Sequence, residues 1–162
     1  MASARFTKAL EGTAVLSGSF LSGSMMTISL ISIPVALETA AEPSHLLHLW
    51  TCMFHYGHRL HPTIAALTST LYGCCALRRR GANKSWAAFA WAGLLTMSIS
   101  PFTWLFLLPT NKVITNLVHG SQGAGAIEME DARRLVIKWS WMHLVRSIFP
   151  LVGGIIAMNR LP

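Results

Sequence analysis

Long apolar runs alternate with short polar segments along this chain. Four runs come close to the about 20 apolar residues that a helix needs to cross a hydrocarbon layer roughly 30 Å thick. They cover about residues 12–34, 60–78, 85–108 and 135–158. This pattern predicts an all-α fold, a four-helix transmembrane bundle formed by a single membrane domain over residues 1–162.

A polar but periodic stretch precedes the second run. Residues 44–61 place apolar side chains at helical spacing but also contain five histidines and Arg59. They predict an additional amphipathic or re-entrant segment, which either lies along the membrane interface or continues as a helix through Pro62. Pro101 is expected to kink or end the third run early. The segment from Pro109 to Arg133 is expected to be a loop.

Composition and charge support a membrane location. Hydrophobic residues make up 52% of the chain and charged residues 12%, which is unlike an ordinary soluble domain. With four crossings, seven basic residues fall on one side: Arg5, Lys8, Arg78, Arg79, Arg80, Lys84 and Arg160. The positive-inside rule places that side and both termini in the cytosol, and we expect an integral, multi-pass protein of the endoplasmic reticulum. Arg78 to Arg80 suit acidic lipid headgroups better than nucleic acid.

The fourth run contains the strongest candidate for chemistry. Trp139, His143 and Arg146 follow one another at steps of four and three, which places them on one helical face. Ionisable residues within a span are costly and usually face the interior of a bundle. Trp139 would hold an aromatic ligand, His143 would take a proton, and Arg146 would stabilise negative charge. The alternative is that His143 and Arg146 only bond neighbouring helices or headgroups.

Two polar residues close the third run. Thr110 and Asn111 follow Pro109, where backbone groups lose their helical partners. They are either a helix cap or contacts to a substrate, since the amide of Asn111 offers both a donor and an acceptor.

Histidines at steps of three suggest a metal site. His55, His58 and His61 are spaced closely enough on a helix to share a copper or zinc ion. The alternative is a set of interfacial histidines bonded to headgroups, with Tyr56 in the aromatic belt.

Several short motifs, taken in order, connect the chain to a known family. They are Ser17-Gly18 and Ser22-Gly23 with Pro34, His55-Tyr56-Gly57 before Pro62, Pro101-Phe102-Thr103, Pro109-Thr110-Asn111, and Trp139 through His143 to Arg146. In these motifs the chain resembles the fungal anthrone oxygenases, small membrane proteins of a broader family long described as having a domain of unknown function.

The resemblance implies an oxygenase that converts an anthrone polyketide into an anthraquinone with molecular oxygen as co-substrate. Our hypothesis gives His143 the role of base, and Arg146 with Asn111 the role of holding the substrate oxygens. The remaining substrate contacts are assigned to five side chains: Trp139, Tyr56, Phe102, Thr110 and His55.

No organic cofactor is expected, because the chain lacks a nicotinamide fingerprint. Two alternatives stay open: a copper or iron oxygenase that uses the histidines, and a non-catalytic membrane anchor or carrier for a polyketide. Gly153 and Gly154 would suit either a homo-oligomer contact or packing against the first span.

Overall fold

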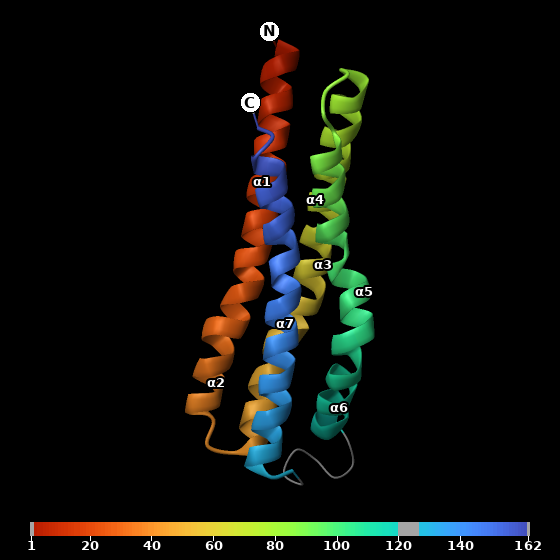
Figure 1. Ribbon diagram of the computed structural model, residues 1–162. Coiled ribbons are helices and arrows are strands. Elements are labelled where there is room, and N and C mark those ends of the chain that lie inside the picture. Colours follow the sequence, from red (N-terminus) through yellow and green to blue (C-terminus); the bar gives the residue numbers. More distant parts are fainter. Residues whose placement is uncertain (1, 120–126, 162) are drawn as a thin grey trace. The chain divides into compact units, whose positions relative to one another are not determined.

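The computed structural model describes residues 2–119 and 127–161, and every regular element within them is helical. The elements, in chain order, are α1 (Ala2–Thr27), η1 (Ile28–Ser32), α2 (Ile33–Thr39), α3 (Pro43–Gly81), α4 (Ala87–Met97), α5 (Ile99–Phe102), η2 (Thr103–Leu107), α6 (Leu108–His119) and α7 (Met129–Met158). The two elements named η are π-helical turns within longer helical runs. Figure 1 shows the α-helices along the chain. The all-α prediction is confirmed.

Three helical runs are long and apolar enough to cross a membrane, by length and composition. They are Arg5–Thr39, Ala87–His119 and Met129–Met158. Their outer faces expose large apolar side chains such as Phe20 and Trp104, with exposed fractions of 65% and 72%. α3 is not among the three, because its N-terminal half contains the five histidines and Arg59. Four crossings therefore stay a prediction.

The structure decides between two alternatives and corrects one expectation about the helix ends. The polar stretch before the second run continues as a helix through Pro62, because α3 runs unbroken from Pro43 to Gly81. The expected loop after Pro109 is wrong for most of its length, because α6 continues to His119 and α7 begins at Met129. Proline is tolerated in the first turn of a helix, and Pro109 lies in the first turn of α6, which begins at Leu108, so it does not end the run. The rest of that predicted loop includes residues 120–126, which lie outside the described residues.

Prolines explain where the helical runs change register. A helical N–H normally bonds the carbonyl four residues earlier, and proline has no N–H. Pro101 therefore leaves the Met97 carbonyl without its donor, and α4 ends at Met97 as predicted. Upstream of Pro34 and Pro109 the helix changes to a π turn, in which a backbone N–H bonds the carbonyl five residues earlier and not four.

The chain divides into two compact units. Unit 1 consists of Met1–Gly23, His61–Ser100 and Ser147–Pro162, and unit 2 consists of Ser24–Leu60 and Pro101–Arg146. Each unit has its own apolar core. The core of unit 1 is built around Tyr72 and Phe89, and that of unit 2 around Trp50 and Trp139.

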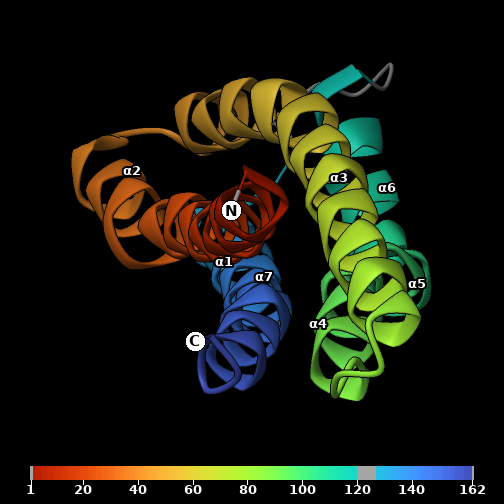
Figure 2. The same cartoon turned by 90° about the horizontal axis from the view of Figure 1, so that it is seen from above.

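Glycines allow close packing of helices in unit 1. A Cβ at Gly153 would lie 2.9 Å from the Ala92 carbonyl oxygen of α4, and one at Gly18 would lie 2.8 Å from the Tyr72 hydroxyl of α3. Gly154 faces Ser19 of α1, where a Cβ would lie 3.6 Å from its Oγ. In this unit α1 also lies beside α7, as Figure 2 shows. Small residues at such contacts are typical of helices that associate within a membrane. Packing against the first span is thus found for Gly154, and a homo-oligomer stays a prediction.

A buried ion pair joins distant parts of the sequence within unit 1. Arg79 donates through Nε and Nη2 to the two carboxylate oxygens of Glu11, at 2.6 and 3.0 Å. Nη2 also lies 2.6 Å from the Arg160 carbonyl oxygen, and the guanidinium covers the Phe89 ring at 4.6 Å. The hydrogen bond with Glu11 raises the pKa of Arg79 above its ordinary value. Arg79 therefore stays charged and holds α1, α3 and the C-terminal segment together.

We predict that Glu11→Gln lowers the free energy of unfolding in detergent by about 3 kcal/mol, because removing one partner leaves the other charge buried and uncompensated. Glu42→Gln, at an exposed position, is the matched control and should unfold like the parental protein. The double variant Glu11→Leu with Arg79→Leu should recover part of the loss. Equal stability of Glu11→Gln and the control would contradict this account of the ion pair.

Candidate functional site

The inward face of α7 carries three polar or aromatic side chains in unit 2. Trp139, His143 and Arg146 expose only 3%, 1% and 8% of their surface. Their spacing predicted one shared face, and the structure buries all three. An imidazole and a guanidinium thus lie one helical turn apart in the interior of unit 2.

A hydroxyl from the first π turn contacts His143. Ser29 Oγ lies 3.0 Å from His143 Nδ1, and the indole of Trp139 stacks on the imidazole with ring centroids 4.6 Å apart. A serine can donate to the unprotonated nitrogen of the ring. The aromatic face stabilises the positive charge that the imidazole acquires when it takes a proton. His143 is therefore equipped to act as a base.

The π turn also explains why Ser29 is held in place. In a regular helix its carbonyl would accept the N–H of Ile33, but that N–H bonds the Ile28 carbonyl. The next residue, Pro34, has no N–H to offer. Ser140 of α7 supplies a donor in their place, with its Oγ 3.3 Å from the Ser29 carbonyl oxygen. The interrupted backbone hydrogen bonding thus leaves the Ser29 carbonyl to bond Ser140, and this bond connects η1 with α7 beside His143.

The second π turn supplies the partner of Arg146. Nη1 of Arg146 donates to Thr103 Oγ1 at 2.5 Å. Its buried Nε has no hydrogen-bond partner, and no carboxylate pairs with Arg146 in the part of the chain that the structure describes. A guanidinium has five N–H donors in a planar fork that matches carboxylates and other oxyanions. The position is suited to an anionic ligand oxygen.

Asn111 and Thr110 are buried within α6, each with 5% exposed. Asn111 Oδ1 accepts the indole N–H of Trp139 at 2.8 Å. Trp50 meets the same indole edge to face at 5.6 Å. Asn111 therefore positions Trp139, and only the amide N–H2 of its side chain is left for a substrate. Because both residues lie inside α6, the alternative that they cap the end of the third run is wrong.

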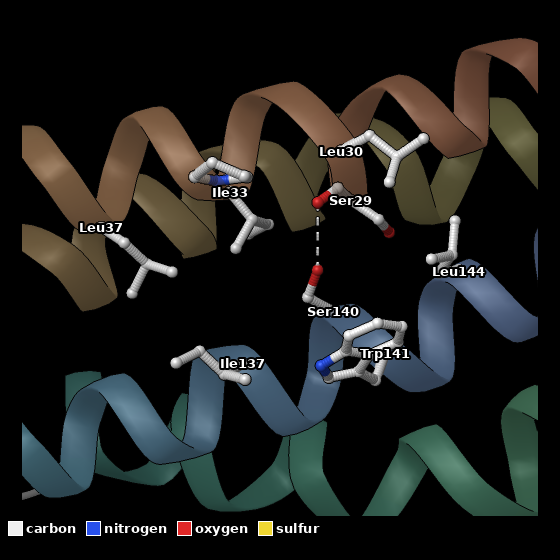
Figure 3. A pocket seen from close by; sticks show the side chains of 9 residues that line it. Ser29, Leu30, Ile33, Leu37, Ile137, Ser140, Trp141 and Leu144 are labelled. Atoms are coloured by element: carbon white, nitrogen blue, oxygen red, sulfur yellow. Dashed lines mark hydrogen bonds between the residues drawn. The ribbon is translucent and has the colours of Figure 1, made fainter.

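A groove opens on unit 2 between the η1–α2 segment and α7. It has a volume of about 190 Å3. Figure 3 shows Ser29 and Ser140 facing each other across it, with apolar side chains on both sides. The residues that line it are Ser29, Leu30, Ile33, Pro34, Leu37, Ile137, Ser140, Trp141 and Leu144. His143 and Arg146 are not among them, and Ser29 connects the groove with the imidazole.

Other predicted contacts lie elsewhere. Tyr56 is 75% exposed, and His55 is exposed beside it, with ring centroids 5.4 Å apart. Trp50 and Phe54 of the same helix face the core and stack on each other, so a residue two positions beyond Phe54 points away from it. Tyr56 is therefore not brought to Trp139. Phe102 is half-buried, packs against the core of unit 2 and contacts Phe106 at 4.7 Å.

The three-histidine ligand set is not assembled. Within residues 2–119 and 127–161, no group of three His, Cys, Asp or Glu side chains gathers closely enough to hold a metal ion. His58 Nδ1 lies 2.9 Å from the Phe54 carbonyl oxygen, and the His55 and His58 rings are 5.8 Å apart. His61 is buried, with 3% exposed.

Sequence reasoning missed Ser29, Ser140 and the hydroxyl role of Thr103. A signal was present, because Ser29 lies five residues before Pro34 and Thr103 lies six before Pro109. A proline in an apolar run leaves upstream backbone groups without partners, and hydroxyl side chains close to that break are candidates to contact neighbouring helices.

Comparison with known proteins supplies the remaining evidence. No solved structure matches the chain. An anthrone oxygenase of Paecilomyces divaricatus is 46% identical over 153 residues, covering 93% of each chain. A noranthrone monooxygenase of Aspergillus flavus is 40% identical, covering 91% of this chain and 71% of its own. An anthrone oxygenase of Emericella nidulans is 36% identical, covering 93% of this chain and 95% of its own. The family model for anthrone oxygenases matches residues 50–156, and the chain belongs to that family.

Proposed function

We propose that this protein is a membrane oxygenase that oxidises an anthrone to an anthraquinone with molecular oxygen, in the biosynthesis of aromatic polyketides. Its relatives are named for this class of activity. The observation that carries the proposal is the buried pair on α7, an imidazole and a guanidinium one turn apart with hydroxyl partners and no carboxylate among the described residues.

The chemistry of an anthrone needs little from a protein. Its central ring carries a CH2 between two aromatic rings, opposite a carbonyl group. Loss of one proton from this carbon leaves the C–H electron pair in an electron-rich anthranolate. The anthranolate passes one electron to oxygen, and the two radicals combine to a peroxide at the same carbon. The peroxide anion takes back the first proton from the base, and the hydroperoxide then loses the second hydrogen of that carbon together with its terminal OH as water, which leaves the quinone carbonyl.

His143 is the base in this scheme. It takes the first proton, and Trp139 stabilises the resulting imidazolium across the stacked rings. A base of this kind typically contributes about 10²- to 10⁴-fold to a rate. Burial helps as well, because excluding water strengthens the interaction between the imidazolium and the anion that forms beside it.

Arg146 and Asn111 act on the negative charge of the anthranolate. The charge is delocalised onto the oxygen opposite the reacting carbon, so a group further along α7 can stabilise it. Arg146 has N–H donors to spare, and its uncompensated positive charge lies in surroundings of low dielectric. Asn111 contributes an amide donor and fixes Trp139. Thr110, Phe102, Tyr56 and His55 remain proposed substrate contacts.

The protein is proposed to work without an organic cofactor, and with no metal. Because the substrate anion itself reduces oxygen, the scheme is complete with a base and an anion-binding group. A histidine-bound copper or iron ion is the alternative within enzymes. A carrier that binds the anthrone without turnover is the alternative from another class.

The membrane topology belongs to the same proposal. α3 from about residue 60 to 78 would cross the membrane beside the three more apolar runs, and both termini would lie in the cytosol, with the endoplasmic reticulum as the favoured membrane. Basic residues of unit 1, such as Arg78 and Arg80, would then meet acidic headgroups at the cytosolic face.

We predict that His143→Ala and Arg146→Ala each lower kcat for oxidation of emodin anthrone in membranes by about 100-fold or more, because one removes the base and the other the anion-stabilising charge. Quinone formation is followed by its colour and by oxygen uptake, after subtraction of spontaneous autoxidation. The matched controls are His119→Ala and Arg134→Ala, which change exposed side chains and should keep the parental rate. Parental turnover by both α7 variants at normal expression would show that the assignment is wrong.

A second prediction separates the metal-free scheme from the metal alternative. Purified protein should oxidise the anthrone at the same rate before and after treatment with a chelator, because the substrate anion supplies the electrons to oxygen and His143 accepts and returns the proton. Metal content is measured on the same samples. Loss of turnover on chelation, with recovery on adding back copper or iron alone, would favour the metal oxygenase.

A further inference from the structure

Ser29 contacts both the groove of unit 2 and the buried imidazole of His143. It is among the residues that line the groove, and its Oγ lies 3.0 Å from His143 Nδ1. His143, Arg146 and Asn111 do not line the groove, so a molecule bound there would reach the base through Ser29, and the charge of Arg146 would act on it without direct contact. We propose that this groove binds the anthrone and that Ser29 relays its proton to His143. The inference rests on the proposed function and specifies the route that the proton takes.

The lining of the groove fits a flat apolar molecule with one reactive polar edge. Seven of its nine lining residues are Leu, Ile, Pro or Trp, and the two serines face each other across it (Figure 3). Its volume of about 190 Å3 is below the roughly 300–1,000 Å3 of pockets that enclose drug-sized ligands. It would therefore cover part of a tricyclic ring system and leave the rest outside.

The groove opens on the outer surface of unit 2. Leu30 and Trp141, at its rim, are 58% and 65% exposed. In a membrane-spanning chain such side chains face lipid, and an anthrone is itself apolar. The substrate would thus enter sideways from the hydrocarbon layer, with its CH2 directed at Ser29.

The proton path is short and balanced. In the tautomer with hydrogen on Nε2, the Nδ1 of His143 accepts the Ser29 hydroxyl proton. As that proton moves to Nδ1, the Ser29 oxygen takes one proton from the CH2 of the anthrone, and the C–H electron pair stays in the ring system. The products are an imidazolium, an intact serine hydroxyl and the anthranolate that then reduces oxygen.

The backbone of η1 fixes the position of Ser29 relative to His143. Ile33 N–H bonds the Ile28 carbonyl and Pro34 has no N–H, so the Ser29 carbonyl is left to accept Ser140 Oγ of α7. Ser29 is thereby tied to the helix that carries His143. π turns within helices are frequently found at functional sites, which agrees with this role.

The test compares Ser29→Ala and Ser29→Thr with the parental protein, using anthrone with either hydrogen or deuterium on its CH2, freshly dissolved so that the label does not exchange. Ser29→Ala should lower kcat by about 10-fold or more and raise the deuterium isotope effect, because proton removal becomes slower than the other steps. Ser29→Thr keeps the hydroxyl and should restore most of the rate. Ser69→Ala, in unit 1, is the matched control, since its hydroxyl donates to the Gly93 carbonyl within that unit, and it should keep the parental values.

The isotope effect does not depend on how much protein folds, so it remains informative for a poorly expressed variant. Parental kcat and isotope effect in Ser29→Ala would overturn the relay. Equal loss in Ser29→Ala and Ser29→Thr with the parental isotope effect would overturn it too, because that result indicates a structural role. If the parental protein itself shows no turnover, the proposed function fails. If the parental protein and Ser29→Ala oxidise the anthrone equally well and His143→Ala does not, only the relay fails.

Discussion

The proposed stabilisation of a substrate anion depends on the cost of burying Arg146 with no carboxylate partner among the described residues. A charge removed from water is expensive unless it is paired or hydrogen-bonded. Among the described residues only the Thr103 hydroxyl is recorded as its hydrogen-bond partner. A bound anion would compensate the charge, which gives the guanidinium a larger stabilising effect on a substrate anion than on a neutral substrate. Such a difference is what accelerates a reaction.

Two prolines provide the geometry around this charge. Pro34 and Pro109 interrupt the hydrogen-bond ladders of their helical runs, and each ladder widens to a π turn just before the proline. Ser29 lies in one of these turns and Thr103 in the other, and each contacts one of the two ionisable groups of α7. Unit 1 holds a different polar contact, in which Glu11 neutralises Arg79. The contrast is informative, because the buried arginine that serves stability is fully paired and the one proposed for chemistry is not.

Much of this arrangement could be predicted from the sequence, because apolar length and helical spacing are local properties. They identified the helical runs, the effect of Pro101 and the inward face shared by Trp139, His143 and Arg146. They failed where the outcome depends on contacts between segments. The spacing of the histidines does not reveal that Tyr56 and His55 face away from the core, and nothing local to Ser29 shows that α7 lies beside it. The helix through Pro109 was missed because a proline both ends one helix and starts another.

The most direct measurement is anaerobic. Without oxygen the proposed cycle stops after the first proton transfer, so the protein should accumulate the anthranolate, whose absorption differs from that of the neutral anthrone. Mixing purified protein with an anthrone under argon should give the anion spectrum in proportion to protein, at a pH where the anthrone in empty micelles stays neutral. Rapid quinone formation on admitting oxygen, with no anion seen beforehand, would contradict the account.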